Sequence, residues 1–344
     1  MKSEFKIRNG AGDLWRYATA LCLFLLATVP ITSAQTTATT SPGAAQTAPK
    51  AAANAPGASA ATAQGFASPQ QAAEALIAAA GNFDVGEFER IFGPGGDDIV
   101  LTGETGNDRQ LAEAFATKAR EKERVSMDPR GASRAFLLVG NDEWPFPVPI
   151  VKRNNQWFFD AEAGRQEILN RRIGRNELDA IQICRGYVEA QYDYAYEKRK
   201  GYDVNQYAQR IISTPGKQDG LAWRNEDGTY GGPIGEKIAV AIEQGYTNKA
   251  EPYHGYFFKV LKGQGPDAPL GQMDYVIGGA MIGGFALVAA PAEYGLTGIK
   301  SFIVSQDGVV YEKDLGEDTL NTFAKMELFN PDKTWSPVEE EDED

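Results

Sequence analysis

The residue best suited to acid–base chemistry is the only histidine of the chain, His254, within the run Pro252-Tyr253-His254-Gly255-Tyr256. Histidine is the side chain that most often donates and accepts protons in catalysis near neutral pH. A loop between residues 289 and 298 carries Glu293 and Tyr294. A carboxylate and a histidine from two loops at one end of a sheet would form an acid–base pair. The residues expected in such a site are His254, Tyr253, Glu293, Tyr294 and Lys217.

A structural role is the alternative interpretation of this histidine. Buried polar groups are usually hydrogen-bonded, so His254 between two tyrosines is typical of a partly buried ring with one satisfied nitrogen. The aromatic neighbours and the following Gly255 also suit the mouth of a ligand pocket. The sequence leaves both interpretations open.

Most familiar cofactor and nucleophile chemistries lack their residues in this chain. Zinc, haem and iron–sulfur sites draw on several His or Cys ligands, and only His254 and Cys184 lie beyond the N-terminal segment. The chain has no Gly-x-Ser-x-Gly, Walker A or dinucleotide glycine motif. The glycine-rich run 278–284 is typical of a turn or bulge. We therefore expect no cofactor and no metal, and we expect Cys184 to be a buried, unreactive thiol.

The N-terminus is typical of a secretory signal peptide. Basic residues precede an apolar run from Ala18 to Ile31, and Thr32-Ser33-Ala34 offers a cleavage site, so residues 1–34 would be removed before Gln35. The apolar run is shorter than the roughly 20 residues that span a bilayer. The expected location is periplasmic or extracellular, without a stable membrane span after cleavage. An uncleaved membrane anchor is the alternative.

The charge and composition of the chain indicate which partners it disfavours and which segments are predicted to be disordered. Removal of residues 1–34 takes away four basic and two acidic residues and shifts the formal net charge from −13 to −15. Such an acidic chain is a poor ligand for nucleic acid. Residues 35–64 are small and polar with one lysine, which predicts a disordered linker. Residues 339–344 are all acidic and predict a solvated tail.

Residues 65–172 predict an N-terminal α+β domain. Ser68-Pro69 is a helix start signal, and helices are expected after it, at 85–92 and at 108–123. The period then changes to that of strands, at 135–139, 148–152 and 156–160, with Asn154-Asn155 as a hairpin turn. Helices followed by a curved antiparallel sheet are similar in outline to the NTF2-like and cystatin-like superfamilies.

Residues 173–338 predict a second α+β domain. Asn176 is expected to cap a long amphipathic helix over 177–198, whose tyrosines are interpreted as packing residues. Shorter helices are expected at 204–212 and 234–243. Antiparallel strands follow between residues 255 and 312, with Asp307-Gly308 as a turn. A long helix followed by such a meander resembles the globular part of type IV pilins and pseudopilins.

Five motifs carry a resemblance to a known family. They are Trp144-Pro145-Phe146-Pro147, Gly174-Arg175-Asn176-Glu177-Leu178, Thr214-Pro215-Gly216-Lys217, Pro252-Tyr253-His254-Gly255-Tyr256 and Met281-Ile282-Gly283-Gly284-Phe285-Ala286. In this order they resemble the DUF2950 family of exported bacterial proteins, over Phe66 to Val338. The resemblance implies a location in the bacterial envelope and the extent of the folded part. It brings no activity, substrate or catalytic residue.

Three functional hypotheses follow from these features. The leading one is a non-catalytic envelope protein that binds or scaffolds an envelope protein or a glycan. The second is a periplasmic hydrolase of peptide, ester or glycan bonds with His254 as acid or base. The third is carbohydrate binding through exposed tyrosines.

Overall fold

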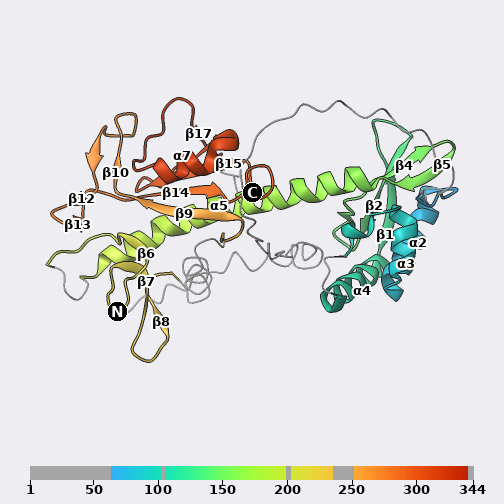
Figure 1. Cartoon of the computed structure of the whole chain (residues 1–344), viewed down its shortest axis with the longest axis horizontal. Coiled ribbons are helices and arrows are strands. Elements are labelled where there is room, and N and C mark those ends of the chain that lie inside the picture. The colour runs from blue at the N-terminus through green and yellow to red at the C-terminus, as the bar shows by residue number, and fades with distance from the viewer. Residues whose placement is uncertain (1–62, 102–104, 199–202, 235–251, 340–344) are drawn as a thin grey trace, which may run out of the picture. The chain divides into compact units, whose positions relative to one another are not determined.

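The computed structural model describes residues 63–101, 105–198, 203–234 and 252–339 (Figure 1). The chain divides into two units, Met1–Ile168 and Leu169–Asp344, which are described separately. The division falls inside helix α5 (Ala161–Tyr196), so the boundary predicted after residue 172 lies within a continuous helix. The predicted signal peptide and nearly all of the predicted linker and acidic tail lie outside the described residues.

Capping side chains define the helix starts in the first unit. The Ser68 hydroxyl accepts a hydrogen bond from the Gln71 amide at 3.1 Å, and the Asp84 carboxylate accepts one from the Glu87 amide at 3.0 Å. These bonds satisfy amides that have no partner within the helix. The helices are α2 (Pro69–Asn82), α3 (Val85–Phe92), the 3₁₀ helix η1 (Asp97–Ile99) and α4 (Thr105–Glu121). The first two agree with the predicted helices.

An antiparallel sheet completes the first unit. Its order is β1-β2-β4-β5, with β3 paired to β2. Its strands are β1 (Glu123–Met127), β2 (Arg134–Val139), β3 (Trp144–Pro145), β4 (Ile150–Arg153) and β5 (Gln156–Phe159). Asn154 and Asn155 have φ of 48° and 66°, the left-handed conformation that tight hairpin turns use. The predicted β4–β5 hairpin is therefore confirmed.

One face of this sheet packs against the helices. The inward side chains of β2, including Ala135, Leu137 and Val139, join the core formed by α2, α3 and α4. Phe159 lies 5.4 Å from Phe92, centroid to centroid. Strand β1 was missed because its sequence, ERVSM, has little apolar character, and the predicted helix ran into it. A short edge strand gains its order from the neighbouring strand rather than from its own pattern.

The second unit is built on a five-stranded antiparallel sheet of order β17-β16-β15-β14-β9. The strands are β9 (Tyr256–Leu261), β14 (Ala286–Pro291), β15 (Lys300–Ser305), β16 (Val310–Asp314) and β17 (Ser336–Pro337). A smaller sheet joins β6 (Arg210–Ile212), β7 (Gly220–Arg224) and β8 (Tyr230–Gly231). Two short hairpins pair β10 (Gly263–Gln264) with β11 (Met273–Asp274), and β12 (Val276–Ile277) with β13 (Ala280–Met281).

Strand β14, between β15 and β9, is covered on both faces, since all six of its residues are buried. Ala180, Cys184 and Tyr187 of α5 share one core with the strands of the sheet. On the other side lies α7 (Thr319–Lys325), preceded by the 3₁₀ helix η2 (Gly316–Asp318). Burial on two faces explains why the sequence of β14 is continuously apolar.

Two helix predictions for the second unit were wrong. The helix predicted over 204–212 is absent: Gln191 of α5 exchanges two hydrogen bonds of 2.8 Å with the backbone of Ala208, and residues 210–212 form strand β6. Asn176 is not a cap either, since it lies inside α5. The helix predicted over 234–243 lies almost wholly outside the described residues.

The α+β class itself is confirmed. Within the described ranges, every helix is too short or too polar to cross a membrane.

Gly298 provides a test of packing in the second unit. A Cβ at this position would collide with the buried Tyr256 hydroxyl, which donates to the Lys300 carbonyl at 2.8 Å. We expect Gly298→Ala to lower the free energy of unfolding by roughly 1–3 kcal/mol. The matched control is Gly174→Ala in α5, where a Cβ meets no atom within 4 Å. This control should raise stability by about 0.5–1 kcal/mol. Equal effects in urea denaturation would contradict the packing argument.

Candidate functional site

His254 occupies a tight turn that leads into strand β9. Tyr253 and Tyr256 exchange backbone hydrogen bonds of 2.9 and 3.0 Å, and His254 and Gly255 between them have φ of 48° and 75°. Two central residues with positive φ are the mark of a type I′ turn. Glycine adopts this conformation freely, whereas a histidine there costs on the order of 1 kcal/mol. The turn therefore contains a strained residue at its most exposed position.

The partner of His254 is Asp179 of helix α5. The distance from His254 Nδ1 to Asp179 Oδ2 is 2.6 Å, and the two side chains are 46% and 37% exposed. The Tyr253 ring packs edge-on against the imidazole at 4.4 Å. Burial, followed by the charge of Asp179, raises the pKa of the Tyr253 phenol. The histidine is thus a half-exposed ring with one satisfied nitrogen, which agrees with the structural interpretation of a partly buried, hydrogen-bonded side chain.

The predicted partner of His254 was Glu293, and the structure corrects this. The loop that carries Glu293 is fixed to α5 by other residues: Asn176 Nδ2 donates to the Thr297 carbonyl at 2.9 Å. Glu177 Oε1 accepts the amides of Ile299 and Lys300 at 2.8 and 2.9 Å. The histidine turn meets the same stretch of helix, because a Cβ on Gly255 would lie 2.6 Å from Asn176 Nδ2. Both segments are brought to α5, and the helix supplies the carboxylate.

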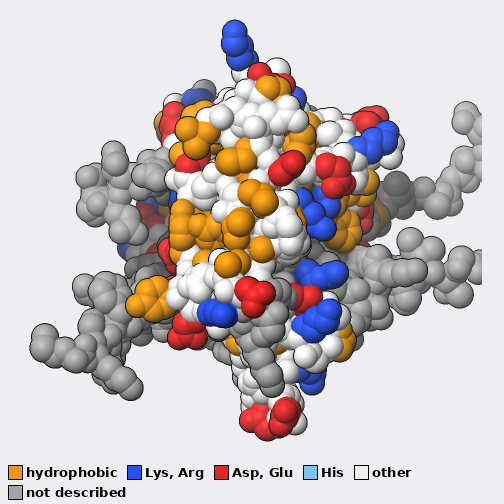
Figure 2. Space-filling model, turned by 90° about the vertical axis from the view of Figure 1, so that its left-hand side faces the viewer, with side chains coloured by type: hydrophobic (Ala, Val, Ile, Leu, Met, Phe, Trp, Pro, Cys, Tyr) orange, Lys and Arg blue, Asp and Glu red, His pale blue; other side chains and the backbone are white. Residues whose placement is uncertain are grey.

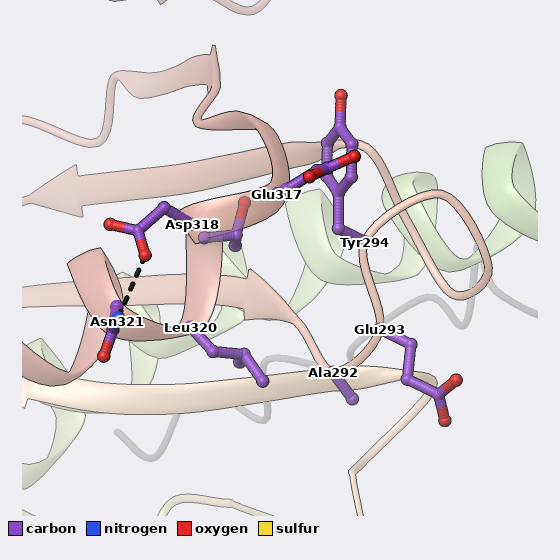
Figure 3. Close-up of a pocket in the computed structure, with 8 residues that line it drawn as sticks. Ala292, Glu293, Tyr294, Glu317, Asp318, Leu320 and Asn321 are labelled. Carbon is purple, nitrogen blue, oxygen red and sulfur yellow. Dashed lines mark hydrogen bonds between the residues drawn. The ribbon is translucent and has the colours of Figure 1, made fainter. Parts of the chain in front are cut away.

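Glu293 and Tyr294 instead line a hollow of about 370 Å³ together with Ala292 and residues 317–321. Figure 3 shows the carboxylates of Glu293 and Asp318 pointing in opposite directions, with Asp318 turned toward Asn321. The Tyr294 hydroxyl donates to Asp314 Oδ2 at 3.2 Å, which raises the pKa of this phenol. His254 is not among the lining residues. Within the described ranges, no group of three His, Cys, Asp or Glu side chains could hold a metal ion.

Lys217 is placed in the turn between β6 and β7. Its amide donates to the Thr214 carbonyl at 2.9 Å, and its side chain is exposed. The Asp219 carboxylate fixes the turn through the Thr214 amide and hydroxyl, at 2.7 and 2.8 Å. No contact joins Lys217 to His254 in the part of the chain that the structure describes. Of the five predicted residues, Tyr253 contacts the imidazole, and the loop of Glu293 and Tyr294 lies against the histidine turn, since the Ala292 amide donates to the Gly255 carbonyl at 2.9 Å.

The described residues place no nucleophile within hydrogen-bond reach of His254. Among the described residues, none donates a hydroxyl or thiol hydrogen bond to the imidazole, whose partner is Asp179. Cys184 is fully buried, and this burial raises the pKa of its thiol to about 12. The thiolate is the reactive form of cysteine, so Cys184 is inert at neutral pH. Its predicted burial is confirmed.

The tyrosines of α5 fall into two groups. Tyr187 and Tyr194 are buried, as the packing interpretation predicted, whereas Tyr192 and Tyr196 are 48% and 85% exposed. The Tyr192 ring packs edge-on against Tyr207, with centroids 6.2 Å apart, and its hydroxyl donates to the Gln306 carbonyl at 2.7 Å. Only part of the tyrosine set is therefore free to meet a ligand.

The exposed tyrosines belong to a surface that sequence reasoning missed. Val204, Ile277 and Ile282 are 48%, 54% and 47% exposed. Two hydrogen bonds hold the segments of these residues together. The Tyr207 amide donates to the Met281 carbonyl at 2.8 Å, which joins the segment of Val204 to that of Ile282. Asn205 Nδ2 donates to the Tyr196 carbonyl at 3.2 Å, which joins the same segment to the end of α5. Figure 2 faces the end of the second unit with β12 and β13, where hydrophobic side chains gather. We name it the apolar end surface; its residues are Tyr192, Tyr196, Val204, Ile277 and Ile282.

The sequence did contain a sign of this surface. Ile277 precedes the glycine-rich run 278–284 and Ile282 lies within it, and Gly278 and Gly279 between them have positive φ in the turn of the β12–β13 hairpin. Isoleucines on either side of a glycine turn end up at a hairpin tip, where no sheet neighbour covers them. The predicted turn is confirmed.

In comparisons with known proteins, the chain matches one family model. The family model described as "Protein of unknown function (DUF2950)" matches residues 63–338. No curated protein and no solved structure matches the chain.

The histidine turn gives a second test. His254→Ala removes the bond to Asp179 and also places alanine at φ 48°, whereas His254→Asn removes the bond but retains a residue that tolerates the left-handed region. We expect the alanine variant to be less stable than the asparagine variant by about 1 kcal/mol, the cost of the strained conformation. Chemical denaturation of both, with Asp179→Asn as the control for the bond alone, measures the difference. Identical stabilities would show that the turn does not require this backbone conformation.

Proposed function

The chain belongs to the DUF2950 family of proteins of unknown function, and we propose that it is an exported bacterial envelope protein that binds or scaffolds a partner protein without catalysis. The observation that carries this proposal is the apolar end surface. Contiguous exposed apolar side chains on a soluble domain are characteristic of interaction sites. Tyrosines are favoured there because a large ring contributes contact area and the hydroxyl remains hydrogen-bonded.

The chemistry around His254 supports a non-catalytic role. A carboxylate that orients an imidazole is one half of a catalytic arrangement, and the other half is a nucleophile or a polarised water in a cleft. In the described residues the His254–Asp179 pair lies on an exposed turn, outside the hollow of the neighbouring loop. Its role is to hold the strained turn against α5.

The hydrolase alternative rests on one observation, the distance of 2.6 Å between His254 Nδ1 and Asp179 Oδ2. A carboxylate at this distance fixes the imidazole orientation, as it does for a general base. The alternative requires that the second ring nitrogen meet a substrate at the surface. An assay with peptide, ester and glycan substrates distinguishes the two functions. The hydrolase alternative predicts hydrolysis that His254→Ala abolishes, whereas the binding proposal predicts no hydrolysis.

Carbohydrate binding has its own supporting observation in Tyr196, a residue that is 85% exposed. Sugar rings stack on exposed aromatic faces, but the apolar end surface also presents the aliphatic side chains of Val204, Ile277 and Ile282. Isoleucine and valine offer nothing to the hydroxyl groups of a glycan, whereas they match the apolar core of a protein interface. The apolar end surface therefore favours a protein partner.

Photocrosslinking tests the binding proposal. With a photoreactive amino acid at Tyr196, the full-length chain in its producing bacterium should give a discrete adduct with one envelope protein. The combined Ile277→Ser and Ile282→Ser changes should remove that adduct because they remove the apolar contact area. Val85 of the first unit, which is 36% exposed, is the matched control position. The same adducts from both positions, or none from Tyr196, would contradict the proposal.

Export has a separate test. A cleaved signal peptide places Gln35 at the N-terminus of the protein in the envelope, because the small residues Thr32-Ser33-Ala34 fit a signal peptidase site. Mass spectrometry of the protein recovered from the envelope fraction should find this N-terminus and no Cys22-containing peptide. Recovery of the intact N-terminus from the membrane fraction would establish the uncleaved anchor instead.

A further inference from the structure

The loop between β10 and β11 contains a leucine at a turn position that favours glycine. The Gly271 amide donates to the Ala268 carbonyl at 2.9 Å, which closes a four-residue turn. Pro269 is the second residue of this turn, and Leu270, the third, has φ of 70°. A proline followed by a residue with positive φ is typical of a type II turn, whose third position favours glycine or asparagine. A bulky side chain there strains the backbone. We name residues 265–272 the Leu270 loop.

The strain at Leu270 is not offset by packing of its side chain. Among the described residues, two large apolar side chains have positive φ, those of Phe83 and Leu270. Phe83 is buried in the core of the first unit, and this burial stabilises it. Leu270 is 92% exposed, the highest exposed fraction among the large hydrophobic residues that the structure describes. The leucine therefore strains the turn and places apolar surface in water, and neither effect favours the folded chain.

The buried side chain of Gln264 holds the backbone on both sides of Leu270. Its amide nitrogen donates to the carbonyls of Pro269 and Gly271 at 2.5 and 2.6 Å. Its amide oxygen accepts the hydroxyl of Tyr275 at 2.9 Å, and Tyr275 is fully buried in the core of the second unit. The turn cannot relax without breaking these buried hydrogen bonds. The conformation of the leucine is thus imposed from the core.

A second set of contacts holds the start of the Leu270 loop. The Asp267 amide donates to Asn330 Oδ1 at 2.8 Å, and Asn330 Nδ2 donates to Asp267 Oδ2 at 2.9 Å. A Cβ on Gly265 would lie 2.4 Å from Asn330 Oδ1, so the loop backbone lies directly against this side chain. Strained residues persist only where the surrounding structure over-determines them, and they are concentrated at binding and catalytic sites.

The composition of the Leu270 loop indicates the class of partner that it can bind. Within residues 265–272, Asp267 is the only charged residue, and no residue is aromatic. Lipid headgroups and nucleic acids attract basic side chains, which this loop does not contain. The carbonyls on both sides of Leu270 already accept hydrogen bonds from Gln264. The tip of the loop therefore offers one aliphatic side chain, which fits an apolar pocket on a protein.

We propose that Leu270 is an anchor that inserts into an apolar pocket of a partner protein. Insertion removes the apolar surface of the side chain from water. Because Gln264 and Asn330 fix the loop before it binds, association orders little additional backbone. The Leu270 loop shares no residue with the apolar end surface, so this proposal does not rest on that surface.

The test begins with a photoreactive leucine analogue at position 270 of the full-length chain in its producing bacterium. The crosslinked protein is then purified, labelled and titrated with the full-length chain, and binding is followed by anisotropy. Leu270→Gly should weaken binding at least about tenfold through loss of the anchor. The same change should raise the urea midpoint of unfolding, because glycine adopts a φ of 70° without strain. A leucine with a purely structural role would instead lose stability and binding together.

The matched control is Leu178→Ala in α5, since Leu178 is 62% exposed and has a helical backbone. It should leave the titration unchanged. Three results would overturn the proposal: no protein adduct from position 270, an unchanged affinity of Leu270→Gly for the purified protein, or a lower urea midpoint for Leu270→Gly. Adducts with lipid alone would assign the loop to a membrane surface and would also overturn it. Loss of the Tyr196 adduct has no bearing on this titration, so the two proposals fail independently.

Discussion

The second unit depends on one constraint: polar side chains in the middle of helix α5 hold the backbone of loops that lie far away in the sequence. Glu177 accepts two loop amides through one carboxylate oxygen, and Asn176 donates to the carbonyl of Thr297. Arg172 Nε donates to the Leu296 carbonyl at 3.1 Å. Loop backbone needs partners as much as strand backbone does. A helix that supplies them fixes loops which carry little apolar area of their own.

The same stretch of helix explains the setting of His254. Asn176 leaves room only for a glycine at Gly255, so the turn lies close against α5. Asp179, three residues further along the helix, then meets the imidazole. Polar side chains of α5 therefore hold both the histidine turn and the neighbouring loop. Asp179, the carboxylate partner of His254, is one of these side chains. This continuity is the physical reason for a structural interpretation of the pair.

Local signals in the sequence predicted much of the fold. Ser68-Pro69, Asn154-Asn155 and Asp307-Gly308 each fix backbone conformation within a few residues, and the elements that they bound are present. The segment 204–209 was mispredicted because its conformation is fixed by Gln191, whose side chain replaces the hydrogen bonds that a helix would have made. The Asp179 partner could not be derived from spacing, because 75 positions separate it from His254. The sequence indicated Glu293 because its loop was expected at the same end of the sheet as His254, whereas α5 contacts both segments and supplies the carboxylate.

A solitary histidine at a docked turn has a practical consequence. The chain contains one imidazole, so its ring-proton resonances can be identified in a one-dimensional NMR spectrum without isotope labelling or assignment by mutagenesis. The edge-on Tyr253 ring at 4.4 Å adds a ring-current shift, and the hydrogen bond to Asp179 makes the resonances sensitive to contact with α5. His254 is thus a built-in spectroscopic probe of the junction between the helix and the loops of the second unit.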